Sequence, residues 1–455
     1  MKMPTYHKNE RGVALVISLM FLVILGMLGT TAYVMTSTDL KIGSNYQAGA
    51  EAFFDADAGI HYGASMIEVG VAAGSFTLPT AIGDPTDPSD TNSTPMTSFT
   101  APTGFNFSFQ NPGLTKVADM QYQFTCIGAG THNSTATITA TVKRKSAIQF
   151  GAFGDKKLDM GNTAAVYSYS HTSNPSPTPG TSTREGDVGS NESVILRNNS
   201  IVDGDVALGE DVAGTDAALT DLGGVVSGTK GEDIDRVDPD PLGVVGGEYA
   251  AKFTTYSVTN DNATHAVVAP GDSITTTGTS LTVGPNETLT LKGQVGGSNF
   301  YWHDVLIKSN FLYIDTTNGP VNIYVTGTFD ANNGSQVINT TDSTCSTNGG
   351  TPATSTCACC CPNTCTRGKP GDFAIFANST TSTDKISIGN SVEYSGLIYA
   401  PYITVRMDNS ADIYGAIVGK EVEIINSVSI YYDTDLADQY ASKDFELTTW
   451  RDVRN

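Results

Sequence analysis

The chain has 455 residues, enough for two or three domains, and carries 25 basic against 47 acidic residues, for a formal net charge of −22. Because the sequence offers no extended basic patch that could displace counterions, this charge argues against nucleic acid and anionic lipid as partners. Charged residues make up only 16% of the chain, which is more typical of an exported β-rich protein than of a cytoplasmic enzyme.

A long uncharged apolar stretch follows a short polar leader, residues 1–12. No charged residue occurs between Arg11 and Asp39. Residues 13–35 can therefore cross a bilayer as one helix, which needs about 20 apolar residues. A secretory signal would instead have a shorter apolar core and a small-residue cleavage site. Because basic residues precede the span, we expect a cytoplasmic N-terminus and place the rest of the chain outside the cytoplasm.

The junction between the leader and the span resembles a class III prepilin signal, with Glu10, Arg11 and Gly12 preceding an apolar run that starts at Val13. In such signals a dedicated peptidase cuts after the glycine and leaves the apolar helix attached. The small residues that follow, and the Ala-Glu-Ala pattern at 50–52, resemble the N-terminal domain of the PilX family of type IV pilus assembly proteins. This resemblance implies cleavage after Gly12 and methylation of Val13. The alternative is an ordinary single-span anchor.

One position departs from the pilin pattern. Most pilins carry a glutamate five residues into the mature chain, where this sequence has Ile17. The glutamate is thought to neutralise the N-terminal amine of a neighbouring subunit, since an unpaired charge in a bilayer is costly. Minor pilins that sit first in the filament lack it, so the resemblance implies a tip or initiation position. Gly26 and Gly29 in the span favour either close helix approach or local melting of the helix during assembly.

The pattern predicts one long helix over residues 13–68, nearly free of helix breakers. The seven-residue step of four apolar residues predicts its packing face: Tyr46, Phe53, Ile60 and Ile67. Three alternating segments predict antiparallel strands: 105–109, 121–125 and 135–142. A pilin-like β head is therefore expected over residues 69–147.

After residue 148, short apolar strands recur between asparagine turns. Asn390, Asn409 and Asn426 are separated by 19 and 17 residues, which predicts the coils of a parallel β-helix. Asparagine suits the left-handed conformation at a coil corner, and stacked asparagine side chains can bond one another. A β-sandwich is the competing interpretation. The predicted fold class is α+β: a long pilin helix with a small antiparallel sheet, then a mostly parallel β-helix-like domain over 148–455.

Two acidic loops have carboxylates spaced closely enough to bind calcium, a cation that prefers oxygen ligands. The candidate ligands are Asp84, Asp87 and Asp90 in the first loop and Asp233, Asp235 and Asp238 in the second. The first loop lacks a following bidentate glutamate. Calcium is the only cofactor that the sequence suggests, and solvated charge is the alternative for both loops.

Six of the seven cysteines fall in an insertion over residues 345–365 that has no apolar periodicity of its own. They are Cys345, Cys357, Cys359, Cys360, Cys361 and Cys365. Outside the cytoplasm we expect disulfides, whose pairing the sequence does not determine. Soft-metal binding and a redox-active loop are the alternatives. Cys126, on a predicted strand, is expected to be a buried thiol or a partner for one loop cysteine.

We expect no enzymatic activity. Parallel β-helices can host polysaccharide lyases and glycosidases, which need paired carboxylates. Asp203 and Asp205 share a strand face, but no acid–base signature or aromatic groove accompanies them. Six tyrosines in the last coils could form a sugar-binding face or an aromatic ladder: Tyr394, Tyr399, Tyr402, Tyr414, Tyr431 and Tyr432.

The resemblance implies a minor pilin or pilus assembly protein, at or near the tip of a type IV pilus, that primes assembly and displays a β-rich domain. Its implied partners are other minor and major pilins, the prepilin peptidase and the inner membrane, with a PilY-type tip adhesin as a further candidate. We expect an inner-membrane protein with a periplasmic domain that reaches the cell surface on assembly. Two alternatives are a pilus-borne adhesin or ligand-binding module and a membrane-tethered β-helix polysaccharide enzyme.

Overall fold

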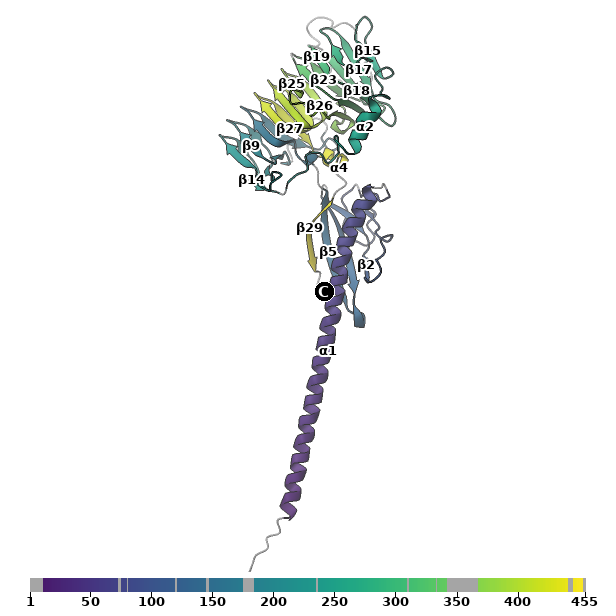
Figure 1. Cartoon of the computed structure of the whole chain (residues 1–455), viewed down its shortest axis with the longest axis vertical. Coiled ribbons are helices and arrows are strands. Elements are labelled where there is room, and N and C mark those ends of the chain that lie inside the picture. The colour runs from purple at the N-terminus through teal and green to yellow at the C-terminus, as the bar shows by residue number, and fades with distance from the viewer. Residues whose placement is uncertain are drawn as a thin grey trace, which may run out of the picture. The chain divides into compact units, whose positions relative to one another are not determined.

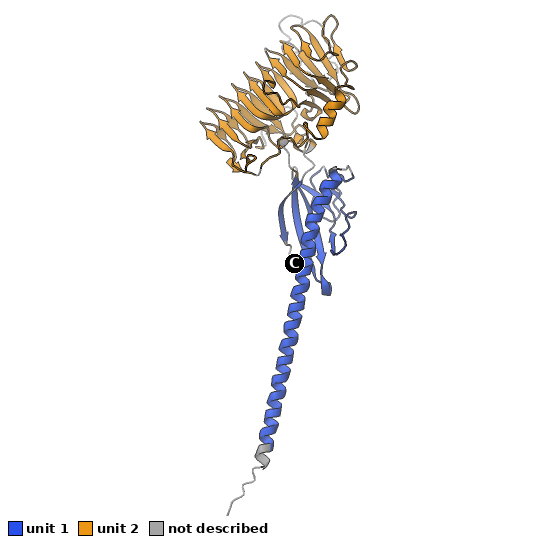
Figure 2. Cartoon of the chain, viewed as in Figure 1, with its two compact units in different colours: residues 1–143, 445–455 blue, residues 144–444 orange. Residues whose placement is uncertain are grey.

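The computed structural model of the chain divides into two compact units (Figure 2). Unit 1 comprises residues 1–143 and 445–455, and unit 2 comprises residues 144–444. The structure describes residues 11–72, 75–79, 81–118, 121–144, 147–174, 184–234, 236–308, 311–332, 334–341, 367–440 and 445–452.

Unit 1 begins with one long helix, α1 (Arg11–Ala72), which confirms the helix predicted from the sequence (Figure 1). Among the described residues, α1 is the one helix that is long and apolar enough to cross a membrane. Between residues 18 and 38 of α1, serine and threonine hydroxyls donate hydrogen bonds to the helix backbone. The Thr31 Oγ1, for example, donates to the Met27 carbonyl at 2.8 Å. Such bonds satisfy the hydroxyls without water, as a bilayer requires.

The second half of α1 packs on an antiparallel sheet with the strand order β1-β3-β4-β5-β29, in which β2 also pairs with β4. These strands are β1 (Ser93–Thr94), β2 (Phe107–Phe109), β3 (Leu114–Ala118), β4 (Gln121–Ala129), β5 (Thr135–Arg144) and β29 (Phe445–Asp452). A short 3-10 helix, η1 (Thr131–Asn133), joins β4 to β5. The three strands predicted from alternation correspond to β2, β4 and β5, so the predicted small antiparallel sheet, here called the head, is present.

Small residues let α1 lie against β4 at very short range. Ala48, Ala52 and Ala56 recur every four residues on α1 and are at most 1% exposed. A Cβ atom added at Gly128 of β4 would collide with the backbone of Ala52 and Ala56. Tyr46, which the sequence analysis placed on the packing face, is 81% exposed instead. The other three predicted residues do pack in the head core: Ile60 and Ile67 are buried and Phe53 is partly buried. The seven-residue step did not mark the alanines and the glycine, because they are not bulky.

The C-terminal strand belongs to unit 1. The sequence analysis extended the β-helix-like domain to residue 455, but β29 is a neighbour of β5 in the head sheet. Thr448 donates a side-chain hydrogen bond to the Thr141 carbonyl at 3.1 Å, and the rings of Phe53 and Trp450 lie 5.9 Å apart. Unit 2 is therefore an insertion between two adjacent strands of the head.

Unit 2 is a parallel β-helix built from three columns of strands, as predicted. The first column contains β16 (Leu281–Val283), β19 (Val305–Lys308), β22 (Phe329–Asn332), β25 (Lys385–Gly389), β9 (Ser193–Leu196) and β12 (Ala218–Asp221). The second contains β17 (Thr288–Lys292), β20 (Phe311–Asp315), β23 (Gln336–Thr340), β28 (Ser429–Asp433), β7 (Ala165–Tyr169), β10 (Ile201–Val202) and β13 (Val225–Val226). The third contains β18 (Ser298–Trp302), β21 (Val321–Val325), β24 (Phe373–Ala377), β8 (Val188–Ser190), β11 (Val206–Leu208) and β14 (Lys230–Asp233). Apolar side chains from all three columns form one continuous core.

The order of the coils in space differs from their order in the sequence. The first strand of the unit, β6 (Ala152–Met160), pairs in parallel with β27 (Asp412–Ile425) on one side and with β8 and β9 on the other. β26 (Glu393–Asp408) precedes β27 in the stack, and both strands bend through all three columns. The chain thus begins in the middle of the β-helix, builds one half, and returns from the far end to close against its own first coil.

Short helices cover the third column. They are α2 (Glu248–Tyr256), α4 (Asp435–Gln439), η2 (Ala147–Gln149) and η3 (Pro370–Asp372). Phe253 of α2 packs edge-on against Tyr324 of β21 at 5.0 Å between ring centroids. A second apolar cluster therefore lies outside the β-helix core, and this face is closed to solvent.

An asparagine ladder stabilises one corner of the β-helix, as predicted. Asn390, Asn409 and Asn426 have φ angles of 56°, 53° and 59°, in the left-handed region. The Asn409 Nδ2 donates to the Asn390 Oδ1 at 3.1 Å, and the Asn426 Nδ2 donates to the Asn409 Oδ1 at 3.2 Å. Each side chain therefore joins its own coil to the next.

We expect Asn409→Ala to destabilise unit 2 by roughly 2 kcal/mol, because it removes both ladder bonds and leaves a left-handed backbone without the polar side chain that favours this conformation. Asn409→Gly should cost less, since glycine tolerates that conformation. Urea unfolding followed by the fluorescence of the buried Trp302 measures both effects. Equal stability of the alanine variant and the unmodified chain would contradict this role for the ladder.

Candidate functional site

The first half of α1 exposes a continuous apolar surface. Its large apolar side chains from Leu15 to Met35 are 46–76% exposed. A surface of this size is stable only when lipid or other apolar helices cover it. The predicted span 13–35 thus lies wholly on α1, at the part of the helix that no other described element of unit 1 covers.

The predicted processing and assembly residues also lie on this part of α1. Gly12 and Val13 follow its first residue, and the side chain of Ile17 is 48% exposed. A Cβ atom added at Gly26 or Gly29 would meet nothing within 4 Å. No close contact within the single chain therefore requires either glycine, and both interpretations, close approach of other helices and local melting of α1, agree with this.

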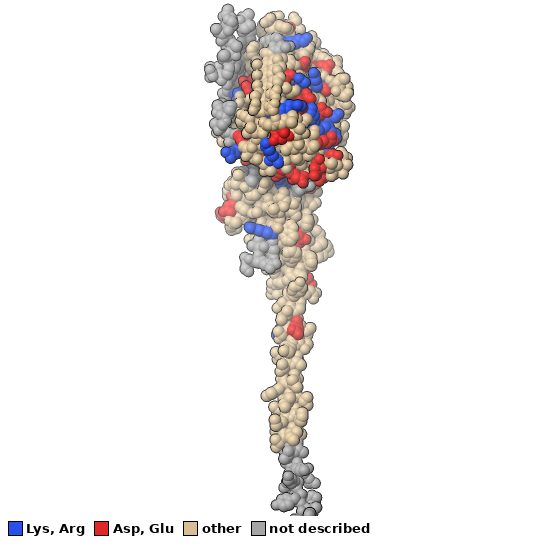
Figure 3. Space-filling model, turned by 90° about the vertical axis from the view of Figure 1, so that its left-hand side faces the viewer, with Lys and Arg blue, Asp and Glu red and all other residues tan. Residues whose placement is uncertain are grey.

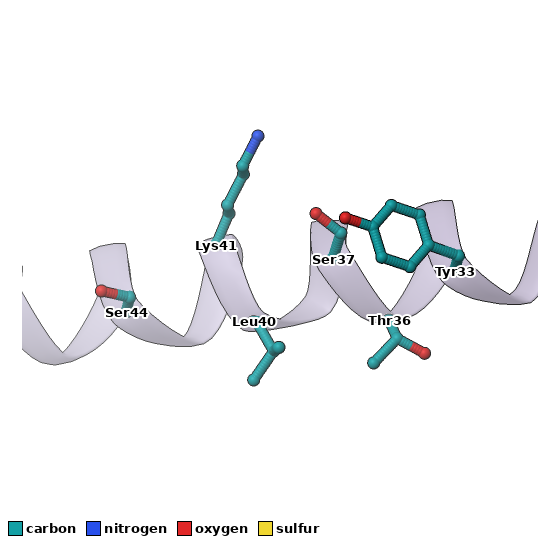
Figure 4. Close-up of a pocket in the computed structure, with 6 residues that line it drawn as sticks. All are labelled: Tyr33, Thr36, Ser37, Leu40, Lys41 and Ser44. Atoms are coloured by element: carbon teal, nitrogen blue, oxygen red, sulfur yellow. The ribbon is translucent and has the colours of Figure 1, made fainter.

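Polar residues begin where the apolar surface ends. A shallow hollow there is lined by Tyr33, Thr36, Ser37, Leu40, Lys41 and Ser44 (Figure 4). All of these residues belong to α1, so the hollow is a feature of the helix surface and not an enclosed binding site. A tyrosine and a lysine next to an apolar span are typical of a membrane–water interface.

The first acidic loop uses its carboxylates as turn caps. Asp84 accepts hydrogen bonds from the backbone and side chain of Thr86, and Asp87 accepts equivalent bonds from Ser89. Asp90 accepts one from the Asp84 N–H at 2.8 Å. These bonds lower the pKa of Asp84 and Asp87. No group of three potential ligands converges on a metal position among the described residues.

The second acidic loop is held by tyrosines. Asp233 lies at the end of β14, Asp235 lies outside the described residues, and Asp238 caps the turn at Asp240. The sequence analysis did not single out Asp240, whose carboxylate accepts hydrogen bonds from the Tyr399 hydroxyl at 3.1 Å and the Tyr402 hydroxyl at 2.9 Å. The hydroxyls of the buried Tyr399 and the half-buried Tyr402 thus fix this loop on the third column.

The cysteines fall into two groups. Those of the insertion over residues 345–365 lie outside the described residues. Cys126 is a free, fully buried thiol on β4, which agrees with one of the two expectations for it. Burial raises its pKa to about 12, so the thiol stays protonated and unreactive while unit 1 is folded.

Two of the six tyrosines singled out in the last coils, Tyr414 and Tyr431, form part of an aromatic ladder. The rings of Tyr414 and Tyr431 stack at 4.8 Å between centroids, and Tyr431 stacks on Tyr167 at 5.7 Å. The Arg367 guanidinium lies 3.6 Å from the Tyr414 ring and pairs with Glu393 at 2.9 Å. Because Tyr414 and Tyr431 are only 9% and 7% exposed, this arrangement favours a structural ladder over a sugar-binding face.

The carboxylates weighed as catalytic groups cap a β-helix corner. Asp203 accepts a hydrogen bond from the Ser227 hydroxyl at 2.7 Å, and Asp205 accepts one from the Thr229 N–H. Asp187, one coil away, accepts a bond from the Asp205 N–H, and burial raises its pKa to about 6. Each carboxylate therefore joins two coils.

Charged residues of both signs alternate along the first column, and Figure 3 shows such interspersed charges on the face of unit 2 turned to the viewer. Asp159 accepts two bonds from Arg197, at 2.7 and 2.8 Å, and pairs with Lys157 at 3.2 Å. Lys157 also pairs with Glu423 at 3.5 Å. This last pair crosses the junction at which the chain closes against its first coil, so ion pairs support the closure.

Two family models match the chain. Residues 11–61 match the family described as PilX N-terminal. The chain therefore carries an N-terminal segment that is similar to the PilX N-terminal family, over 51 of its 455 residues. Residues 259–439 match a domain of unknown function, DUF7305, which covers the half of the β-helix that the chain builds second. No curated protein matches the chain.

Three solved structures show a distant likeness. The competence-associated pilin ComZ from Thermus thermophilus is 11% identical, with 89% of this chain and 97% of that chain covered and a TM-score of 0.30. An ice-binding protein from the Antarctic ascomycete Antarctomyces psychrotrophicus is 12% identical, with 63% and 96% covered and a TM-score of 0.28. The DUF3494 domain of ice-binding protein 1 from Shewanella frigidimarina is 13% identical, with 54% and 93% covered and a TM-score of 0.23. At these TM-scores the likenesses decide nothing about function.

Proposed function

We propose that this chain is a minor pilin or pilus assembly protein that acts at or near the tip of a type IV pilus. It is cut after Gly12, methylated at Val13 and held in the inner membrane by residues 13–35 before assembly. The observation that carries the proposal is the PilX N-terminal match over residues 11–61 on a helix whose first half is apolar and uncovered. That surface suits lipid before assembly and the helices of other pilins afterwards.

Two features support a tip position over repeated incorporation. Ile17 stands where most pilins carry the glutamate that serves a neighbouring subunit. Unit 2 spans residues 144–444, about twice the length of unit 1, and is inserted into the head of the pilin. A domain of that size is easier to accommodate once, at the end of a filament, than at every subunit. In this proposal unit 2 is displayed outside the cell and carries no catalytic activity.

The proposal is tested by the mass of the mature protein in cells with and without the prepilin peptidase. We expect a chain that starts at methylated Val13 only when the peptidase is present, and an uncut chain for Gly12→Val. Gly26→Ala is the matched control, because the added methyl group meets nothing in the single chain and the residue lies away from the cut. An uncut N-terminus in the unmodified protein would reduce α1 to a plain anchor and overturn the proposal.

A deletion separates assembly from adhesion. The deletion must remove residues 145–444 and keep 445–455, because β29 completes the head sheet. If the chain primes assembly and unit 2 is not an adhesin, the shortened chain still supports piliation and surface attachment is unchanged. Normal piliation combined with loss of surface attachment would instead assign unit 2 to adhesion.

A further inference from the structure

The two ends of the β-helix are built differently (Figure 1). At one end the outer edges of two of the three outermost strands, β17 and β18, are covered, while β16 pairs with β19 alone among the described strands. β15 (Ala266–Val268) pairs antiparallel with β17, and the Asn262 side chain accepts from the Tyr301 N–H at 3.1 Å and donates to the Tyr301 carbonyl at 2.8 Å. Asp261 accepts from the Asn299 N–H at 2.8 Å in the same manner. The backbone N–H and C=O groups on the outer edges of β17 and β18 are therefore hydrogen-bonded to β15 and to the side chains of Asn262 and Asp261.

At the opposite end, β12, β13 and β14 each pair on one side only, with β9, β10 and β11. The Val225 N–H donates to the Ser200 carbonyl at 2.8 Å and the Ser227 N–H donates to the Val202 carbonyl at 2.9 Å. In a parallel ladder alternate residues bond opposite sides, so the backbone groups of Val226 point away from the β-helix. No described residue pairs with β13 on that side.

The same alternation applies to β12. The Ala218 N–H donates to the Glu192 carbonyl at 2.9 Å and the Leu222 N–H donates to the Leu196 carbonyl at 2.7 Å. The backbone groups of Leu219 therefore also point outward. We call β12, β13 and β14 together the open end. An uncovered strand edge of this kind is a template for a further strand.

Residues 209–234, which contain β12, β13 and β14, expose apolar side chains and carry acidic ones, which we call the acidic rim. Val225, Leu222 and Val212 are 58%, 52% and 81% exposed. Residues 209–234 contain six acidic side chains and one basic side chain, Lys230, which pairs with Asp221 at 2.7 Å. The acidic side chains are Glu210, Asp211, Asp216, Asp221, Glu232 and Asp233. The net formal charge of this segment is thus one minus six, or −5.

We propose that the open end is a docking edge for an extended, basic segment of a partner protein, which adds as a further strand to β12 or β13. Backbone hydrogen bonds to the outward groups supply affinity, and lysine or arginine side chains of the partner meet the acidic rim. The charge selects against a second copy of this chain, because each copy would bring the same −5 to the contact. The inference rests on unit 2 alone and stands whether or not the chain acts at a pilus tip.

The test uses the full chain in detergent and a dye-labelled peptide in which valine and lysine alternate. Two control peptides are a proline-interrupted peptide with the same number of lysines and a peptide with glutamate in place of lysine. Fluorescence anisotropy should show saturable binding of the first peptide only. The proline control matters because the whole chain carries a charge of −22 and attracts any polycation.

Val225→Lys should weaken binding of the valine–lysine peptide about tenfold or more, because it places a positive charge beside a positively charged peptide strand. Glu232→Lys should act in the same direction from the rim. Val295→Lys is the matched control, since this 93% exposed valine lies in the turn before β18 at the closed end, and it should leave binding unchanged. Circular dichroism checks that each variant is folded.

Three results would overturn the proposal. The first is equal binding of the proline-interrupted peptide, which would mean charge attraction without strand pairing. The second is equal weakening by Val225→Lys and Val295→Lys, and the third is absence of binding. Self-association of the full chain that Val225→Lys abolishes would assign the edge to a second copy instead.

Discussion

Gly128→Ala is expected to loosen the pilin head strongly, by roughly 3 kcal/mol, although it adds a single methyl group. The new Cβ would collide with the carbonyl of Ala52 and the backbone of Ala56, and backbone cannot rotate out of the way as a side chain can. α1 must therefore move away from β4. The separation would expose the head core, which includes Phe107, Phe124 and Cys126.

Cys126 reports on this opening. Its thiol is fully buried, and burial raises its pKa to about 12, so it reacts with a maleimide only when the head opens. A loss of 3 kcal/mol should speed labelling of the peptide that contains Cys126 about a hundredfold. Mass spectrometry of that peptide separates it from the other cysteines.

Gly43→Ala is the matched control for this labelling experiment. It adds the same methyl group to α1 at an exposed position where a Cβ meets nothing within 4 Å. The labelling rate should stay unchanged or fall slightly, since alanine favours the helix. Equal labelling of the two glycine variants would contradict the close approach of α1 to β4.

The sequence predicts the helices and strands of this fold better than it predicts which strands pair with one another in space. A helix of 62 residues and recurrent Asn turns follow from local patterns, because each depends on residues that are close in the chain. The closure of the β-helix between β27 and β6 pairs Ile417 with Ala152, and no local pattern marks that pairing. The pairing of β29 with the head sheet is equally non-local. The sequence of this eight-residue strand does not indicate which sheet it joins.

The same distinction holds for the sites. Gly12, Ile17 and the apolar span can be predicted because their chemistry lies in one continuous segment. Of the helix–sheet contact, Ile60 and Ile67 were predicted, but the close approach of Ala52 to Gly128 was not, because apolar periodicity detects bulky side chains. Arg367 and Tyr167, which extend the tyrosine ladder at its two ends, lie 200 positions apart in the sequence, and their spacing gives no signal. The open end could not be predicted from the sequence either, because a strand edge is unpaired only when no other strand lies beside it in space.

Asp433 should make unit 2 less stable as the pH rises, against the usual behaviour of a carboxylate. It is 2% exposed at the end of β28, accepts hydrogen bonds from the His171 and Asp435 N–H groups, and has a pKa that burial raises to about 7. An unfolded aspartate has a pKa of about 3.9. Between these values the unfolded chain releases a proton that the folded chain keeps, so stability falls with rising pH.

Asp433→Asn keeps the acceptor oxygen and removes the charge. The variant should match the unmodified chain near pH 4 and become more stable by roughly 2–4 kcal/mol at pH 8. Urea unfolding can be followed in a Trp450→Phe background, in which Trp302 of unit 2 is the remaining tryptophan of the two in the chain. Parallel stability curves for the two proteins from pH 4 to pH 8 would show that Asp433 ionises normally.

Asp435→Asn, two residues away, should change the stability of unit 2 at pH 8 in the opposite direction to Asp433→Asn. Burial acts to raise the pKa of Asp435, but hydrogen bonds from Thr172 and Ser170 outweigh it and hold the pKa below its usual value. Its stabilisation is therefore present above about pH 4 and is lost as the pH falls through the folded-state pKa. We expect Asp435→Asn to be less stable than the unmodified chain at pH 8, where Asp433→Asn is more stable. The two substitutions remove the same charge from the same corner, so an effect of net charge would change the stability in the same direction for both. Changes in opposite directions would instead show that burial dominates at Asp433 and hydrogen bonding at Asp435.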